Sequence, residues 1–253
     1  MQLEGQAAIV TGGGSGLGAE VAAALAREGM RVGVLDINEA AANAVAAKTG
    51  GAACRCDVAD GAGAEAAVAT ITAGIGAPRL LVNCAGIGTA ARIVGREGPM
   101  PLTAFEQIVR VNLIGSFNLL RIAANAMSVL APLDGGERGV VVNTASIAAF
   151  DGQVGQCGYA ASKGGIVSLT LPAARELARY GIRVVTIAPG LFRTPLLESL
   201  PAEIQASLGA SVPFPARLGE PSEFAALVLH IATNPMLNGE VIRLDGALRM
   251  AAR

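Results

Sequence analysis

Tryptophan is absent from this chain, and histidine, tyrosine, lysine and cysteine are scarce. The 253 residues include one histidine, two tyrosines, two lysines and 17 arginines. Because His230 stands alone, a histidine-based metal site is not expected, and no metal is assigned. The four cysteines match neither a disulfide framework nor a zinc-binding pattern, so we expect reduced thiols and a cytoplasmic protein. These cysteines are Cys54, Cys56, Cys84 and Cys157.

Charge and long apolar runs are also lacking. The net charge is −1 and no basic run occurs, which argues against a nucleic-acid partner. No apolar run approaches the roughly 18 residues that span a bilayer, and residues 1–5 lack a secretion-signal pattern, so no membrane is expected. Yet 52% of the residues are hydrophobic and only 15% are charged. We therefore expect other copies of the chain to cover apolar surface in a homo-oligomer.

Short apolar segments alternate with helical stretches along the whole chain. Strands are expected at 7–11, 31–35, 52–56, 80–83, 140–143, 183–187 and 240–244, and the main helices at 16–28, 39–48, 64–73, 103–130, 159–179 and 222–233. This alternation predicts one α/β domain over residues 1–253, a Rossmann fold with a seven-stranded, doubly wound parallel sheet. The long segment 190–218 contains four prolines and many apolar residues, and is expected to be a substrate lid within that domain.

A glycine-rich turn follows the first strand and opens the first helix. The stretch Thr11–Gly18 (TGGGSGLG) contains Gly12, Gly16 and Gly18. Glycines allow a close approach to a pyrophosphate, whose charge is stabilised by the free N–H groups at the start of a helix. This spacing is not G-x-G-x-x-G, so the turn alone is weak evidence for a dinucleotide.

The ends of the next three strands strengthen the dinucleotide hypothesis. Asp36 ends the second strand, 20 residues after Gly16, where a carboxylate can bind an adenosine ribose diol and repel a 2′-phosphate. The sequence therefore favours NAD over NADP. After the third strand, Asp57-Val58 is positioned to hydrogen-bond the adenine edge. After the fourth, the small residues of 83–86 (NCAG) leave room for the cofactor to cross the strand ends.

Tyr159 and Lys163 are four residues apart in the stretch GYAASKGG, so they share one face of the expected helix. A tyrosine titrates near pH ~10, and proton transfer near neutrality needs that pKa lowered by about 3 units, or roughly 4 kcal/mol. An ammonium ~4 Å away supplies about that much at an effective dielectric constant of ~20. The pair is therefore interpreted as a tyrosine acid–base group assisted by lysine.

Taken together, the motifs T-G-x-x-x-G-x-G, N-N-A-G and Y-x-x-x-K resemble those of the short-chain dehydrogenase/reductase superfamily, in order and approximate spacing, over essentially the whole chain. Cys84 departs from the usual second asparagine of N-N-A-G. Several longer stretches are similar to a narrower group, the type 2 3-hydroxyacyl-CoA dehydrogenases, also called 17β-hydroxysteroid dehydrogenase type 10. These stretches are 139–165, 186–197, 212–219 and 234–250.

The resemblance implies roles for individual residues. Tyr159 is the acid–base group, Lys163 assists it, Ser146 donates to the substrate carbonyl, and Asn112 holds a water in a proton relay reaching Lys163. Substrate contacts are expected from Ser146, Gln153 and Tyr159, with Cys157 facing the substrate as well. Cofactor contacts are expected from Gly12, Ser15, Gly16, Leu17, Gly18, Asp36, Asp57, Val58, Asn83, Cys84, Ala85, Gly86, Tyr159, Lys163, Pro189, Phe192 and Thr194.

The expected activity is hydride transfer between NAD(H) and a secondary alcohol or ketone, with (S)-3-hydroxyacyl-CoA and 3-oxoacyl-CoA as the favoured small-molecule substrates. The alternatives are a broad-range dehydrogenase for hydrophobic secondary alcohols, ketones or hydroxysteroids, a 3-oxoacyl-carrier-protein reductase, and a non-enzymatic NAD-binding interaction protein. Arg193 departs from the narrower group, and we expect it to point outward rather than to recognise an acidic substrate group. Arg92 and Arg96 are either CoA-phosphate contacts or solvated loop residues. The resemblance also implies a homotetramer.

Overall fold

The computed structural model describes residues 1–252, apart from the side chain of Leu196. Seven strands form one sheet in the order β3-β2-β1-β4-β7-β8-β9, and every neighbouring pair is parallel. The strands are β1 (Ala7–Thr11), β2 (Arg31–Asp36), β3 (Ala52–Arg55), β4 (Pro78–Asn83), β7 (Gly139–Thr144), β8 (Ile182–Pro189) and β9 (Val241–Leu244). All seven strands and the predicted seven-stranded parallel sheet are therefore confirmed.

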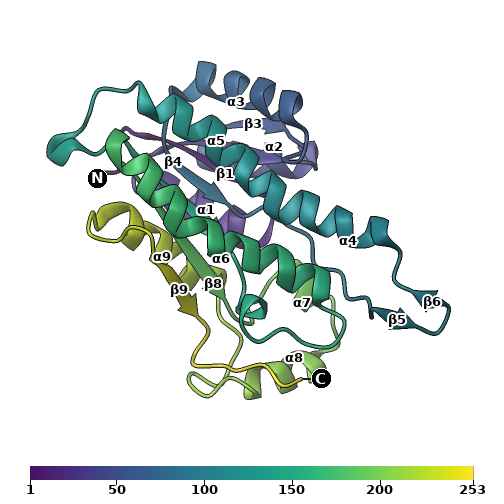
Figure 1. Ribbon diagram of the computed structural model, residues 1–253. Helices are drawn as coiled ribbons and strands as arrows, with labels where there is room; N and C mark the ends of the chain where they lie inside the picture. Colours follow the sequence, from purple (N-terminus) through teal and green to yellow (C-terminus); the bar gives the residue numbers. More distant parts are fainter. Residues whose placement is uncertain (253) are drawn as a thin grey trace.

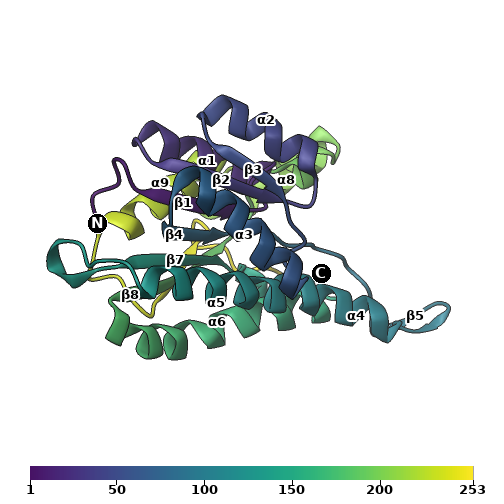
Figure 2. The same cartoon turned by 90° about the horizontal axis from the view of Figure 1, so that it is seen from above.

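Helices cover both faces of this sheet, as Figures 1 and 2 show. One face packs against α1 (Gly16–Arg27), α2 (Glu39–Thr49) and α9 (Pro221–Thr233), and the other against α3 (Gly61–Ile75), α5 (Gly115–Ser128) and α6 (Cys157–Leu177). Two separate apolar clusters result, one on each side of the strands. The central strands are apolar throughout because both of their faces are buried.

The expected helix at 103–130 is interrupted. It consists of α4 (Leu102–Val109), a π-helical turn at Arg110–Ile114 and α5. Asn112 lies in this turn and is completely buried. Turns of this kind occur frequently at functional sites, because the extra residue redirects neighbouring polar groups.

Two excursions leave the sheet at its carboxyl edge. The short strands β5 (Val94–Gly95) and β6 (Gly98–Pro99) form a hairpin that projects beyond α4 (Figure 1). The segment 190–218 contains α7 (Pro195–Glu198) and α8 (Ala202–Ala210), which the sequence analysis did not anticipate because prolines dominated the pattern. Its role as a lid remains a prediction.

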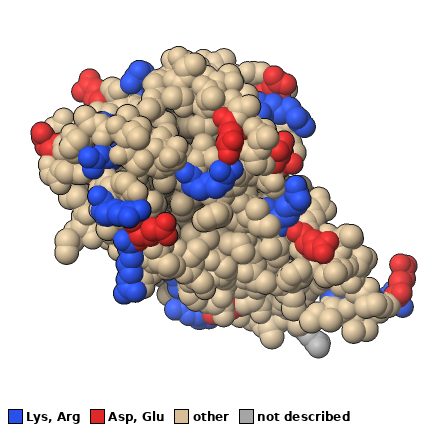
Figure 3. Space-filling view, turned by 45° about the horizontal axis from the view of Figure 1, so that its top comes forward, with Lys and Arg blue, Asp and Glu red and all other residues tan. Residues whose placement is uncertain are grey.

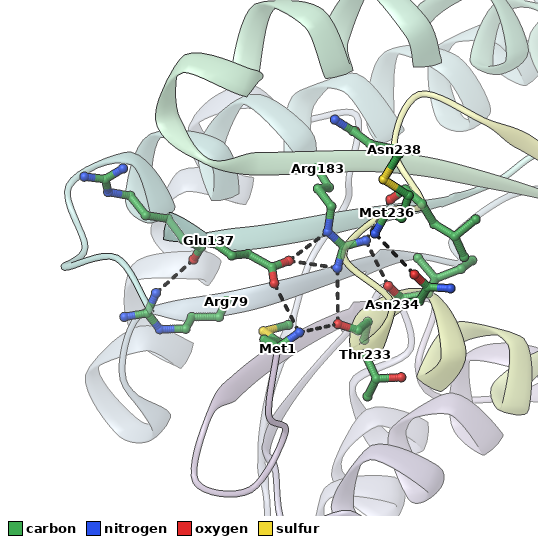
Figure 4. A network of polar contacts seen from close by, with 12 residues as sticks. Met1, Arg79, Glu137, Arg183, Thr233, Asn234, Met236 and Asn238 are labelled. Atoms are coloured by element: carbon green, nitrogen blue, oxygen red, sulfur yellow. Dashed lines mark hydrogen bonds and ion pairs between the residues drawn. The ribbon is translucent and has the colours of Figure 1, made fainter. Parts of the chain in front are cut away.

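A buried ionic network holds the opposite, amino-terminal edge of the sheet (Figure 4). Arg183 on β8 pairs with Glu137 at 2.8 Å, and its guanidinium donates to the carbonyls of Ile231, Ala232 and Leu237. The ammonium group of Met1 contacts the other carboxylate oxygen of Glu137 at 3.1 Å. Each charged group in this network has several partners, so the network joins the elements at the amino edge. The expected site lies at the opposite, carboxyl edge.

Charged groups are sparse on the surface. On the face drawn in Figure 3, basic and acidic side chains lie in small groups separated by wide uncharged areas. Among the described helices, none combines the length and the apolar character that a membrane crossing requires.

Candidate active site

The strand order reverses direction between β1 and β4, and the glycine loop lies at that switch point. Ligands of doubly wound sheets bind outside the carboxyl ends of the strands at such a point. Gly12 has φ +60°, and a Cβ there would lie 2.7 Å from the Cα of Ala85. A Cβ on Gly18 would collide with the carbonyl of Gly12. Any side chain at these positions would fill the loop, so the glycines keep open the cradle that a pyrophosphate needs.

The start of α1 is prepared for an anion. Ser15 is its N-cap, but the side chain makes no capping hydrogen bond and is exposed. The first turn of α1 contains no acidic residue. The N–H groups at the start of α1 and the exposed hydroxyl of Ser15 therefore suit a phosphate. Leu17, in the same turn, is half-buried and packs against the apolar cluster on the α1 face.

Asp36 closes the far side of this cradle. One carboxylate oxygen accepts from the N–H of Gly14 at 2.9 Å, and the other accepts from Asn38 at 2.9 Å. Each oxygen keeps further acceptor capacity, so the carboxylate can still bind a ribose diol. The pairing register sets Arg55 of β3 directly beside Asp36, on the same face of the sheet.

Other expected cofactor residues have structural roles as well. The amide of Asn83 donates to Ser116 and Asn143, and its oxygen accepts from Thr11, so this side chain is committed inside the protein. Asp57 accepts from the N–H of Ala59.

Two further members of the expected cofactor set follow the ends of β3 and β4. Val58 is buried against Gly115, and the exposed Gly86 leaves open the ground above the end of β4. A Cβ on Gly86 would lie 3.6 Å from the Nζ of Lys163, so the small residue keeps space beside the lysine.

Tyr159 and Lys163 lie on one face of α6, as their spacing predicts. The Nζ of Lys163 is 5.8 Å from the centre of the Tyr159 ring and donates to the carbonyl of Thr144 at 2.7 Å. Lys163 is only 5% exposed. The lysine thus joins α6 to the end of β7 and places its charge beside the phenol.

Burial dominates the ionisation of both groups. It lowers the pKa of Lys163 to about 8, opposed by the nearby Cys84 thiol. It also raises the pKa of Tyr159, opposed by a hydrogen bond with Ser146. This differs from the expectation that the ammonium lowers the tyrosine pKa, because in the free protein the cost of burying a phenolate is larger. The resting tyrosine is therefore protonated at neutral pH.

Ser146 and Asn112 complete the constellation. The hydroxyl oxygen of Ser146 accepts from the N–H of Ala148 at 3.1 Å, so the serine caps a short helical turn at Ile147–Ala149 and also bonds Tyr159. Asn112 clamps the backbone of Ile87 through two hydrogen bonds, of 2.8 and 2.9 Å. It also donates to Ser162 at 3.0 Å. The contacts of Asn112 are thus structural, and the expected water relay remains a prediction.

The residues expected around the substrate have the following surroundings, and their contacts with substrate stay predictions. Gln153 donates to the carbonyl of Ala251, so the C-terminal segment occupies one of its amide hydrogens. Cys157, the first residue of α6, is exposed. Thr194 follows the carboxyl end of β8, which Pro189 closes, and lies over the glycine loop, 3.8 Å from a Cβ placed on Gly16.

Phe192 and Arg193 turn away from the crevice. The ring of Phe192 is buried edge-on against Phe224, at 6.4 Å between ring centres, so only its backbone is free to meet a nicotinamide. Arg193 is exposed and pairs with Glu220 at 3.2 Å, in agreement with the outward orientation that we expected. Arg92 and Arg96 are exposed on the hairpin segment.

Two supporting groups escaped the sequence analysis. The backbone carbonyl of Thr144 accepts a hydrogen bond from Lys163, and residue type does not predict a contact made by the backbone. Ser162 bridges Asn112 and the carbonyl of Tyr159, at 3.0 and 2.8 Å. The contact of Ser162 could have been predicted from the sequence, since this serine lies between Tyr159 and Lys163 on the same helix.

Comparison with known proteins agrees with this geometry. Residues 6–205 match the short chain dehydrogenase family. Rat 3-hydroxyacyl-CoA dehydrogenase type-2 is 48% identical over 98% of this chain and 97% of its own length. Human (3R)-3-hydroxyacyl-CoA dehydrogenase is 32% identical over 98% and 97%. The crystal structure of 3-hydroxyacyl-CoA dehydrogenase type-2 from Mycobacterium avium superimposes with a TM-score of 0.94 at 41% identity, covering 100% of this chain and 99% of that one.

The burial of Lys163 leads us to expect that this residue lowers the free energy of unfolding while it is needed for turnover. Because its folded-state pKa of about 8 lies below the ordinary 10.5, the charged form destabilises the fold at pH 7, and this cost disappears as the pH rises through that window. We expect Lys163→Met to abolish turnover yet to raise the free energy of unfolding by ~2 kcal/mol at pH 7, after allowing for the unpaired Thr144 carbonyl. Urea denaturation at pH 7 and 10 measures this, and the gain should shrink at pH 10.

The control is the other lysine of the chain. Lys48 is exposed in the last turn of α2, so Lys48→Met should change the free energy of unfolding by no more than about 0.5 kcal/mol. A Lys163→Met protein that is less stable than the parent at pH 7 would show that the ammonium is not a burden to the fold.

Proposed function

Because the chain belongs to the short-chain dehydrogenase family, we propose that it is an NAD-dependent (S)-3-hydroxyacyl-CoA dehydrogenase, working in either direction on the hydroxyl or carbonyl at C3. Membership makes it an oxidoreductase with a nicotinamide cofactor. The observation that carries the proposal is the grouping of Ser146, Tyr159 and Lys163 beside the glycine loop. The substrate class is supported by the 48% identity to the rat protein, and the S configuration by the lower identity, 32%, to the (3R) enzyme.

Each side chain has a distinct task in this mechanism. When bound, the nicotinamide supplies or accepts the hydride. In reduction, Tyr159 transfers its phenolic proton to the oxygen of the ketone as the carbon receives the hydride, while the Ser146 hydroxyl donates a hydrogen bond to that oxygen. Lys163 favours the phenolate that is left behind. In oxidation the phenolate must form first, so the raised pKa of Tyr159 makes oxidation favoured at alkaline pH.

NAD is proposed rather than NADP because of Asp36. Its carboxylate is fixed against the glycine loop by the N–H of Gly14, where a 2′-phosphate would meet negative charge at short range.

A homotetramer is proposed for the assembly. Leu102, Ile114 and Phe117, on the run from α4 to α5, are each more than half exposed, and Leu171 on α6 is 44% exposed. These side chains suit subunit contacts, and a monomer in sedimentation at micromolar concentration would contradict the proposal.

Removing the phenolic hydroxyl tests the chemistry. Tyr159→Phe should lower kcat by at least about 10³-fold, because no other group is placed to move the proton. NADH binding, followed by cofactor fluorescence, should stay within about twofold, since the hydroxyl forms no part of the glycine cradle. A variant with more than a few per cent of the parental kcat would remove Tyr159 from the mechanism.

The substrate class is tested with four ketones. We expect kcat/KM with NADH to be highest for acetoacetyl-CoA and to fall by about 10²-fold for a free β-keto ester, since CoA contacts are then lost. Acetophenone and a 17-ketosteroid represent the broad-range and hydroxysteroid alternatives. If either of these exceeds acetoacetyl-CoA, the acyl-CoA assignment is wrong although the dehydrogenase chemistry stands; NADH binding with no turnover of any ketone would favour the interaction-protein alternative.

Cofactor choice is tested at Asp36. Asp36→Asn keeps an acceptor for the Gly14 N–H but removes the charge, and should raise the ratio of NADPH to NADH kcat/KM by about tenfold or more. Arg55 is the neighbouring cation, so adding Arg55→Gln should reverse part of that gain. An unchanged ratio in Asp36→Asn would mean that NAD preference has another origin.

A further inference from the structure

The C-terminal segment 245–252 leaves β9 and runs towards α8, as the yellow trace in Figure 1 shows. Arg243, inside β9, is the charged side chain at its root. The guanidinium Nε of Arg243 donates to Asp245 at 2.7 Å, and Nη2 donates to Asp151 at 2.7 Å and to the carbonyl of Leu248 at 2.9 Å. The Arg243 side chain is 21% exposed. One cation therefore joins the start of this segment to a distant part of the chain.

That distant part is the serine loop, defined here as residues 146–154. Asp151 lies in it, and its N–H donates to the carbonyl of Ile147, the residue that follows Ser146. The guanidinium of Arg243 also lies over the ring of Phe150, 5.1 Å from the ring centre. The position of Asp151 is thus linked by one hydrogen bond to the backbone beside the catalytic serine.

Two more contacts run along the same seam. Gln153 donates through Nε2 to the carbonyl of Ala251, and the N–H of Val154 donates to the carbonyl of Ala252, each at 3.0 Å. Beneath them Ile147 packs with Leu248 and with Val212 of the 190–218 segment. The C-terminal segment therefore contacts both walls of the expected substrate site.

Charge-assisted hydrogen bonds are about twice as strong as neutral ones, and a partly buried pair is less screened than one in water. The Arg243–Asp151 bond is the ion pair between the serine loop and the base of this segment; the contact with Phe150 is a cation–π interaction, and the Gln153 and Val154 hydrogen bonds are neutral. The ion pair is therefore the contact whose loss should most loosen the serine loop.

We propose that Arg243 is a positioning residue: through Asp151 it fixes the serine loop against the C-terminal segment and so sets where Ser146 and Gln153 meet the substrate. The proposal rests on the proposed function in assigning those two residues to the substrate. Arg243 is assigned no chemical role, since its guanidinium is bonded to Asp151, Asp245 and the Leu248 carbonyl.

The sharpest variant is Asp151→Asn, which removes the charge on the serine loop and leaves the Arg243–Asp245 pair intact. We expect kcat/KM for the preferred ketone to fall by about tenfold, mainly in kcat because Ser146 acts on the transition state. Cofactor Kd should stay within about twofold, since the glycine cradle lies elsewhere. Arg243→Gln should lose at least as much, and Arg243→Lys should recover part of it.

Arg249→Gln is the matched control. Arg249 also bonds Asp245, at 3.5 Å, and the Leu248 carbonyl, at 2.9 Å, but it is 63% exposed and these hydrogen bonds stay within the C-terminal segment. Its kcat/KM should stay within about twofold of the parent. A purely structural role for Arg243 would lower the thermal midpoint while kcat per folded molecule stayed constant, which would overturn the proposal.

Hydrogen exchange gives a readout that needs no substrate. In Asp151→Asn, peptides covering 147–154 and 245–252 should exchange faster together, while the glycine-loop peptide is unchanged. If the parent fails to reduce any 3-oxoacyl-CoA, the proposed function fails, and this exchange pattern still decides the link. Unchanged exchange at both segments, or unchanged kcat/KM for whichever ketone the parent reduces, would overturn the positioning role.

Discussion

The buried ammonium of Lys163 is the constraint on which the active site depends. It is held at 2.7 Å on the carbonyl of Thr144, where water cannot solvate it fully, and its pKa falls to about 8. A lysine in such a place costs stability, and only a function explains keeping it. Much of the neighbouring architecture serves to hold this charge: the end of β7 supplies the carbonyl, α6 supplies the side chain, and Gly86 leaves the space beside it.

The same burial sets the direction of the chemistry. In the free protein burial shifts the pKa of both Tyr159 and Lys163 in the direction of the neutral form, because neither a phenolate nor an ammonium is well solvated there. A protonated phenol beside a lysine that is still mostly charged at neutral pH is an acid that can donate a proton to a ketone oxygen in the proposed reduction. Formation of the phenolate requires positive charge nearby, and the oxidised nicotinamide carries one. In the proposed mechanism, a bound oxidised nicotinamide would add its positive charge to that of Lys163 and so favour the phenolate.

The fold was largely readable from the sequence because strands buried on both faces are apolar at nearly every position and glycines mark the turns between units. Candidate site residues could be named where the proposed chemistry depends on side chains: Tyr159, Lys163, Ser146 and Asp36 all lie at the carboxyl edge, and their roles stay predictions. The sequence could not predict which backbone groups form contacts or how deeply individual side chains are buried. The carbonyl that holds Lys163 has no residue signature, the sign of the Tyr159 shift depends on how deeply the ring is covered, and the inward turn of Phe192 depends on a partner 32 residues away.

The two edges of the sheet show how the chain divides its few charges. At the amino edge, Arg183 and Glu137 are almost fully buried and have several partners each, an arrangement that resists opening. At the carboxyl edge, Arg243 is paired with Asp151 and Asp245, but Lys163 is bonded to a neutral carbonyl and Asp36 to two backbone N–H groups. A charged group that is already paired with an opposite charge attracts a ligand only weakly, whereas Lys163 and Asp36 can still interact electrostatically with one. Lys163 and Asp36 therefore keep charge that a ligand can use, whereas Arg183, Glu137 and Arg243 are held in ion pairs that support the structure around them.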